Sequence, residues 1–80
     1  MRYNRGDLQS TLTAACDAAR RWGRTAYVFG TAFGLLVERF KPPFKQDYYE
    51  ATAGGTVTFH EFDPIGYNWS SRCVRRGMDG

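Results

Sequence analysis

The sequence predicts an α+β fold in which one N-terminal helix packs on a four-stranded antiparallel sheet. Apolar residues recur at spacings of three and four over residues 8–22, which indicates an amphipathic helix. Four later segments alternate in polarity, as strands do, and a Gly54-Gly55 pair separates the last two of them. A chain of 80 residues suffices for one small domain, so we expect a single domain over residues 1–80.

The helix is expected over residues 8–22, because its apolar side chains fall on one stripe: Leu8, Leu12, Ala15, Cys16, Ala19 and Trp22. Asp7 is a suitable N-cap and Gly23 a suitable C-terminal stop. The stripe consists largely of small residues, which permit close approach to a flat partner such as a sheet. The expected core positions are Leu12, Ala15, Ala19, Val28, Val37 and Phe59.

The strands are expected at residues 24–30, 34–40, 48–53 and 56–62. Pro42-Pro43 must leave the sheet, because consecutive prolines donate no backbone hydrogen bonds. Gly54-Gly55 is a signal for a two-residue hairpin loop. Residues 67–80 carry no clear pattern. There we expect Trp69 to fold back onto the domain and the last few residues to fray.

The alternation along each strand assigns side chains to the two faces of the sheet. The aliphatic set suits the helix, and one helix covers only one face of a sheet. The uncovered face is therefore expected to carry Tyr27, Phe29, Phe40, Tyr48, His60 and Phe62, together with Glu38 and Glu50. This aromatic, partly charged surface is left for water, for the C-terminal segment or for a partner, and a large exposed patch of this kind is typical of an interaction surface.

Charge and hydropathy favour an intracellular protein. The net charge is +3, with arginines concentrated at both ends of the chain, where they favour solubility and could also contact phosphate. No run approaches the roughly 18 apolar residues of a membrane span. The N-terminus lacks the hydrophobic segment of a secretory signal. We expect a location in the cytoplasm of a bacterial host, without membrane contact.

Residues suited to catalysis are scarce. Cys16 and Cys73 are too few for a disulfide framework or a zinc site, and Cys16 falls on the apolar stripe of the helix. His60 is the sole histidine, and Glu50 can meet it across the hairpin on the uncovered face. A lone histidine on a strand is more commonly structural than catalytic. We therefore expect no catalysis, no metal and no cofactor.

Nucleic acid is a second possible partner for the uncovered face, because aromatic side chains on a sheet stack on bases. Glu38 and Glu50 on the same face would repel phosphate, and the Lys/Arg-Gly-Phe signature of RNA-recognition modules is absent. A protein partner is therefore favoured over RNA or DNA.

The chain resembles small orphan proteins of bacteriophages and mobile elements in its size and build. An alanine- and arginine-rich helix, Leu12-Thr13-Ala14-Ala15-Cys16-Asp17-Ala18-Ala19-Arg20-Arg21, runs directly into Thr25-Ala26-Tyr27-Val28-Phe29 and a small sheet. Anti-CRISPR proteins are the best-known group of this kind, and they act by binding a host machine. A second resemblance, carried by His60 and the scattered arginines, is to small basic toxin ribonucleases.

The resemblance implies a non-enzymatic inhibitor that binds a larger host protein or nucleoprotein complex, such as a CRISPR effector, and obstructs it. The alternative is a small basic RNA-binding protein or a ribonuclease-type toxin. Aromatic and arginine side chains dominate protein interfaces. The expected binding residues are accordingly Tyr27, Phe29, Phe40, Tyr48, Phe62, Arg72, Arg75 and Arg76.

Overall fold

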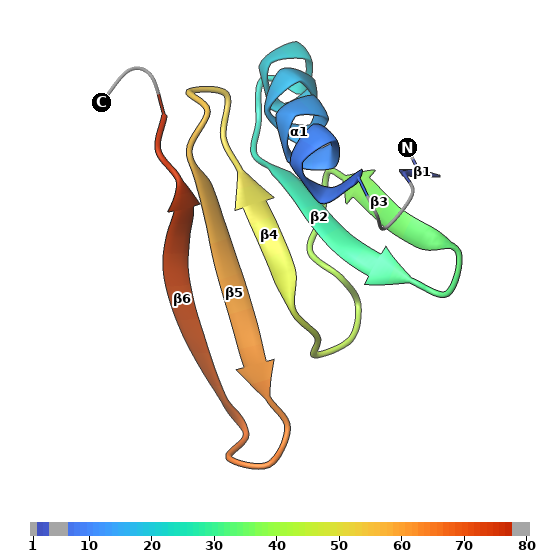
Figure 1. Ribbon diagram of the computed structural model, residues 1–80, viewed down its shortest axis with the longest axis vertical. Helices are drawn as coiled ribbons and strands as arrows, with labels where there is room; N and C mark the ends of the chain where they lie inside the picture. Colours follow the sequence, from blue (N-terminus) through green and yellow to red (C-terminus); the bar gives the residue numbers. More distant parts are fainter. Residues whose placement is uncertain (1, 4–6, 78–80) are drawn as a thin grey trace.

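The chain forms one helix packed against an antiparallel sheet (Figure 1). The computed structural model describes residues 2–3 and 7–77. The strands lie side by side in the order β1-β3-β2-β4-β5-β6. The elements are β1 (Arg2–Tyr3), α1 (Leu8–Trp22), β2 (Ala26–Thr31), β3 (Gly34–Glu38), β4 (Tyr48–Ala51), β5 (Val57–Asp63) and β6 (Asn68–Arg75).

The α+β prediction is confirmed, but the predicted number of strands is too small. All four predicted strands are present as β2 to β5, with ends that differ from the prediction by at most two residues. The predicted tail contains a further long strand, β6, which pairs with β5, and the two-residue strand β1 pairs with β3. The signal for β6 is weak because it is an edge strand whose residues are almost all exposed. Residues 78–80, which were expected to fray, lie outside the described residues.

Helix α1 has the predicted bounds, and its apolar stripe faces the core, with Leu8 and Trp22 at its two ends only partly buried. It ends at Gly23, whose φ of 67° places it in the left-handed region and whose N–H donates to the carbonyl of Ala19 at 2.9 Å. The prediction for its start is wrong in one respect, since the Asp7 carboxylate makes no capping hydrogen bond. The Thr11 hydroxyl instead donates to the Asp7 carbonyl at 2.9 Å.

The core lies between α1 and the middle of the sheet. Alanines on the helix and in the strands are fully buried, so the helix backbone approaches the sheet closely: Ala15, Ala18, Ala19, Ala26 and Ala51. Leu12, Val28, Val37 and Val57 fill the remaining space. Phe59, which was predicted to be a core residue, is only half-buried.

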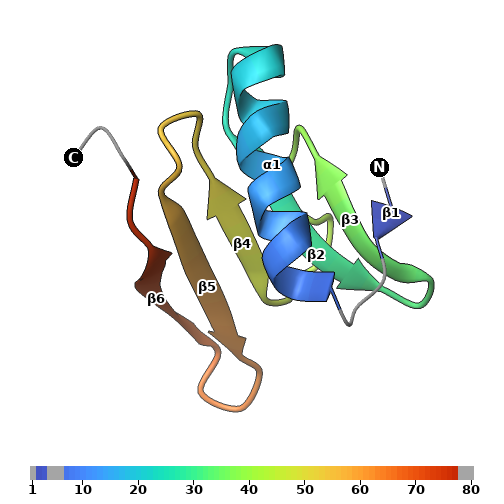
Figure 2. The same ribbon diagram turned by 45° about the horizontal axis from the view of Figure 1, so that its top comes forward.

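The reason is the position of α1, which lies over β2, β3 and β4 while the β5–β6 hairpin extends beyond it (Figures 1 and 2). The helix side of this hairpin is therefore partly open. There the Phe59 ring packs against the ring of Tyr49 at 4.7 Å and against the guanidinium of Arg72 at 4.9 Å.

The connection between β3 and β4 shapes the surface of the sheet opposite the helix. The segment 39–47 must cross β2 to join β3 to β4, and it does so on the face away from α1 (Figure 1). This segment contains Pro42-Pro43, which leaves the sheet as predicted. The Gln46 amide tethers it by donating to the Gly30 carbonyl at 3.0 Å.

The hairpin between β4 and β5 is tight but has three loop residues, 53–55, rather than the predicted two. Thr52 and Thr56 close it with a backbone hydrogen bond of 3.0 Å. Gly55 has a φ of 97°, which a residue with a side chain rarely adopts. The glycine pair therefore predicts the hairpin correctly and its loop length incorrectly.

Candidate functional site

The face of the sheet opposite α1, here called the open face, carries a continuous series of ring contacts. Strand register creates them, because it places Tyr48 opposite His60 and Phe62 opposite Trp69. Tyr48 is the centre of the series, with ring centroids 4.8 Å from His60, 5.7 Å from Trp69 and 6.0 Å from Tyr27. We call the connected set the aromatic surface, and it consists of Tyr27, Tyr48, His60, Phe62, Tyr67 and Trp69.

The end of the aromatic surface lies at the turn between β5 and β6. The Phe62 ring is 5.0 Å from Trp69 and 5.2 Å from Tyr67. Tyr67 has a φ of 55°, a left-handed conformation that is uncommon for a residue other than glycine. Its N–H donates to the Asp63 carbonyl at 2.7 Å, which closes the turn and holds the ring beside Phe62.

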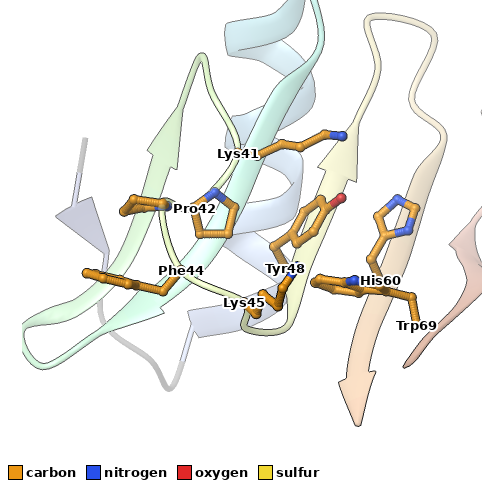
Figure 3. A pocket seen from close by; sticks show the side chains of 8 residues that line it. Lys41, Pro42, Phe44, Lys45, Tyr48, His60 and Trp69 are labelled. Atoms are coloured by element: carbon orange, nitrogen blue, oxygen red, sulfur yellow. The ribbon is translucent and has the colours of Figure 1, made fainter. Parts of the chain in front are cut away.

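A pocket of about 520 Å³ opens between this surface and the crossing segment. Tyr48, His60 and Trp69 form one wall, and residues of the segment 41–45 form the other (Figure 3). Lys41 and Lys45 are exposed at its rim. The ammonium of Lys45 lies 5.9 Å from the centre of the Phe62 ring and 5.6 Å from that of Tyr67, within the range of cation–π attraction.

His60 is held from both sides by hydrogen bonds to neighbouring strands. Its Nε2 lies 2.8 Å from Glu50 Oε1, and its Nδ1 lies 2.7 Å from Ser71 Oγ. A carboxylate only accepts hydrogen bonds, so Nε2 carries the proton and Nδ1 accepts one from the Ser71 hydroxyl when the imidazole is neutral. The predicted meeting of His60 and Glu50 across the hairpin is thus present. It fixes the ring as part of the pocket wall.

The predicted aromatic site residues are not equally accessible. Phe29 and Tyr48 are only 5% and 9% exposed, so neither offers a free ring face. Tyr27 and Phe62 are half-buried. Phe40 lies beyond the end of β3, which stops at Glu38, and its ring is exposed. These five residues therefore do not form the evenly exposed patch that was expected.

The three arginines expected in the binding surface lie apart from the aromatic surface. Arg72 stacks on Phe59 on the helix side, with a nitrogen 3.5 Å from the Glu61 carboxylate. The Arg75 guanidinium donates to Thr13 Oγ1 at 2.9 Å and to Gln9 Oε1 at 2.8 Å. Arg76 is exposed beyond the end of β6. Arg75 accordingly ties the last strand to the helix.

Sequence reasoning missed most of the pocket. Trp69, expected only to fold back onto the domain, is 43% exposed and completes the aromatic surface from β6. Lys41, Lys45 and Ser71 were not among the expected binding residues. The alternation of Trp69, Ser71 and Cys73 is the one signal that could have found this edge of the site, since it places all three on the open face.

No family model, curated protein or solved structure matches this chain. Among the described residues, no three His, Cys, Asp or Glu side chains gather where they could bind a metal ion. The one described helix is too short and too polar to span a membrane.

Proposed function

We propose that the chain is a non-enzymatic binding protein that docks through the open face of its sheet onto a larger protein assembly and obstructs it. The observation that carries this proposal is the aromatic surface, which presents connected rings beside an open pocket. Rings that are already packed against one another lose little conformational freedom on binding, and aromatic side chains dominate the energetics of protein interfaces.

The distribution of charge supports a protein partner over nucleic acid. The open face carries Lys41 and Lys45 together with Glu38 and Glu50, so its charges nearly balance. Two arginines lie outside the aromatic surface. Arg39 stacks on Trp22 and Arg72 stacks on Phe59. Proteins that bind nucleic acid gather their positive charge on the contact surface.

The build of the chain, with its alanine- and arginine-rich helix and small sheet, supports an inhibitor of the anti-CRISPR kind from a phage or mobile element. A bacterial multi-subunit complex, such as a CRISPR effector, is the kind of target that this proposal names. The proposed setting is the host cytoplasm.

The proposal is tested by capturing a complex from bacterial host lysate with tagged protein, followed by mass spectrometry. Trp69→Ala should weaken the capture by about 2 kcal/mol or more, roughly thirtyfold in affinity. Phe33→Ala is the matched control, because Phe33 is an exposed ring in the turn between β2 and β3, outside the aromatic surface. Equal capture by wild type and a folded Trp69→Ala variant would remove the open face as the docking surface.

A second candidate function, RNA binding or cleavage by a ribonuclease-type toxin, is favoured by one observation. His60 bonded to Glu50 is a possible acid–base group, and it lies in a pocket with Lys41, a cation suited to phosphate. The purified chain would then cleave a single-stranded RNA oligonucleotide, and His60→Ala would slow cleavage about 10²–10⁴-fold. Glu61→Gln is the control, since Glu61 lies on the other face of β5. Intact RNA after incubation with the folded wild-type chain would remove this candidate.

A further inference from the structure

The two lysines of the pocket have no carboxylate partner among the described residues. Lys41 and Lys45 are the only lysines in the chain. None of the ion pairs between described side chains includes either of them. Their ammonium groups are thus available to a ligand, at the rim of a pocket whose other wall consists of rings.

Three acidic side chains around the pocket accept hydrogen bonds from other groups, and the fourth, Glu38, forms no ion pair with either lysine. Glu50 contacts His60 Nε2 at 2.8 Å, and Asp47 accepts the N–H of Phe62 at 2.8 Å. Asp63 accepts the N–H of Ile65 at 3.0 Å within the turn after β5. No described carboxylate forms an ion pair with Lys41 or Lys45, so each ammonium can form a direct ion pair with a carboxylate of a ligand.

The pocket is also preformed on both sides. Pro42 and Pro43 fix the backbone of one wall, because the proline ring restricts φ. The opposite wall is held by strand register and by the hydrogen bonds of His60. A preformed site of about 520 Å³ can receive one large side chain with little ordering cost.

We propose that this pocket binds an acidic segment of the partner protein that carries an aromatic residue. The aromatic side chain enters between the segment 41–45 and Trp69, and flanking carboxylates pair with Lys41 and Lys45. This inference rests on the proposed function, and it specifies which part of the partner the open face recognises. A nucleic acid strand is less suitable, because its phosphates repeat along its whole length and would also meet Glu38 and Glu50, whereas a peptide can confine its carboxylates to the positions beside Lys41 and Lys45.

The probe is a fluorescent peptide with the sequence Asp-Glu-Trp-Glu-Asp flanked by glycines, and its binding is measured by fluorescence anisotropy at low and at physiological salt. We expect binding that weakens with salt and that falls about tenfold or more in the double variant Lys41→Glu/Lys45→Glu. Lys41→Arg/Lys45→Arg should retain it. Replacing the peptide's tryptophan by serine should also weaken binding by about tenfold.

The matched control is Arg21→Glu/Arg24→Glu, which changes the net charge by the same amount at exposed positions near the end of α1. It should alter peptide affinity by less than about threefold. An equal loss in the two double variants would overturn the proposal, because attraction would then depend on overall charge. So would tighter, lysine-dependent binding of a single-stranded RNA oligonucleotide, or no binding of the peptide at all.

The lysate experiment separates this inference from the proposed function. If Trp69→Ala loses the captured complex while Lys41→Glu/Lys45→Glu retains it, the open face docks but does not recognise an acidic segment. If both folded variants retain the complex, the proposed docking face itself is wrong. If both variants lose it and Arg21→Glu/Arg24→Glu retains it, both proposals are supported.

Discussion

Single residues of the core illustrate how much a domain of this size depends on each side chain. Leu12 is 2% exposed and lies on the helix stripe over the middle of the sheet. Leu12→Ala would remove buried methyl groups and leave a cavity, at a cost of about 2–5 kcal/mol in the free energy of unfolding. Chemical denaturation would measure this, with Leu36→Ala as a comparison at a half-buried position on the open face. Equal, small losses would contradict the helix-on-sheet core.

The buried thiol of Cys16 should make the stability of the fold depend on pH. Burial raises the pKa of the Cys16 thiol, although Arg75 and Arg20 oppose the effect. The folded state therefore favours the protonated thiol, and its contribution to stability is complete below the ordinary thiol pKa and is lost as the pH rises through the folded value. The free energy of unfolding should fall with rising alkaline pH more steeply in the wild type than in Cys16→Ala. Identical pH profiles would contradict this assignment.

The element scale shows why the sequence predicts α1 better than β6. The helix repeats its pattern over four turns and ends at a glycine, and its bounds match the prediction. The faces of β2 to β5 follow from alternation, which survives errors of one or two residues at strand ends. Neither face of β6 is buried, so its sequence need not alternate between apolar and polar residues. The stretch Asn68-Trp69-Ser70-Ser71-Arg72 therefore resembles a loop.

The candidate site was predicted only in part for a related reason. The aromatic face follows from local alternation, but the pocket depends on which strands become neighbours. The segment 39–47 crosses the open face because β4 pairs with β2 and not with β3. Nothing local to Lys41 or Lys45 encodes that pairing.

The end of α1 allows a test of one backbone position. Gly23 has a φ of 67°, and a Cβ at this position would meet no atom within 4 Å. Gly23→Ala should therefore cost only the backbone preference, about 1 kcal/mol in the free energy of unfolding, and Gly23→Asn less. Thermal denaturation of both variants would measure the difference. A neutral Gly23→Ala substitution would show that the helix end can shift to a right-handed turn.

At the scale of the whole molecule, stability should be unevenly distributed. Helix α1 packs on β2, β3 and β4, whereas β5 and β6 extend beyond it and the residues of β6 are almost all exposed. Backbone amides of β2 should therefore exchange with solvent more slowly than those in the distal half of the β5–β6 hairpin, which α1 does not cover and which can open without disturbing the core. Hydrogen exchange followed by mass spectrometry or NMR would measure this. Uniform protection along the sheet would mean that the hairpin opens only with the whole domain.

The two outer edges of the sheet differ in what they offer to other copies of the chain. The edge at β1 is only two residues long, while the edge at β6 extends over eight residues whose outward backbone groups face no further strand in the described chain. Long open edges are templates for fibril growth, and natural proteins guard them with charge. Arg72 supplies such a guard, because antiparallel pairing of two β6 strands would bring positive charges together along a shared edge. We therefore expect the arginines of β6 to disfavour polymerisation of the chain, and a neutral, β-branched residue at position 72 should increase it.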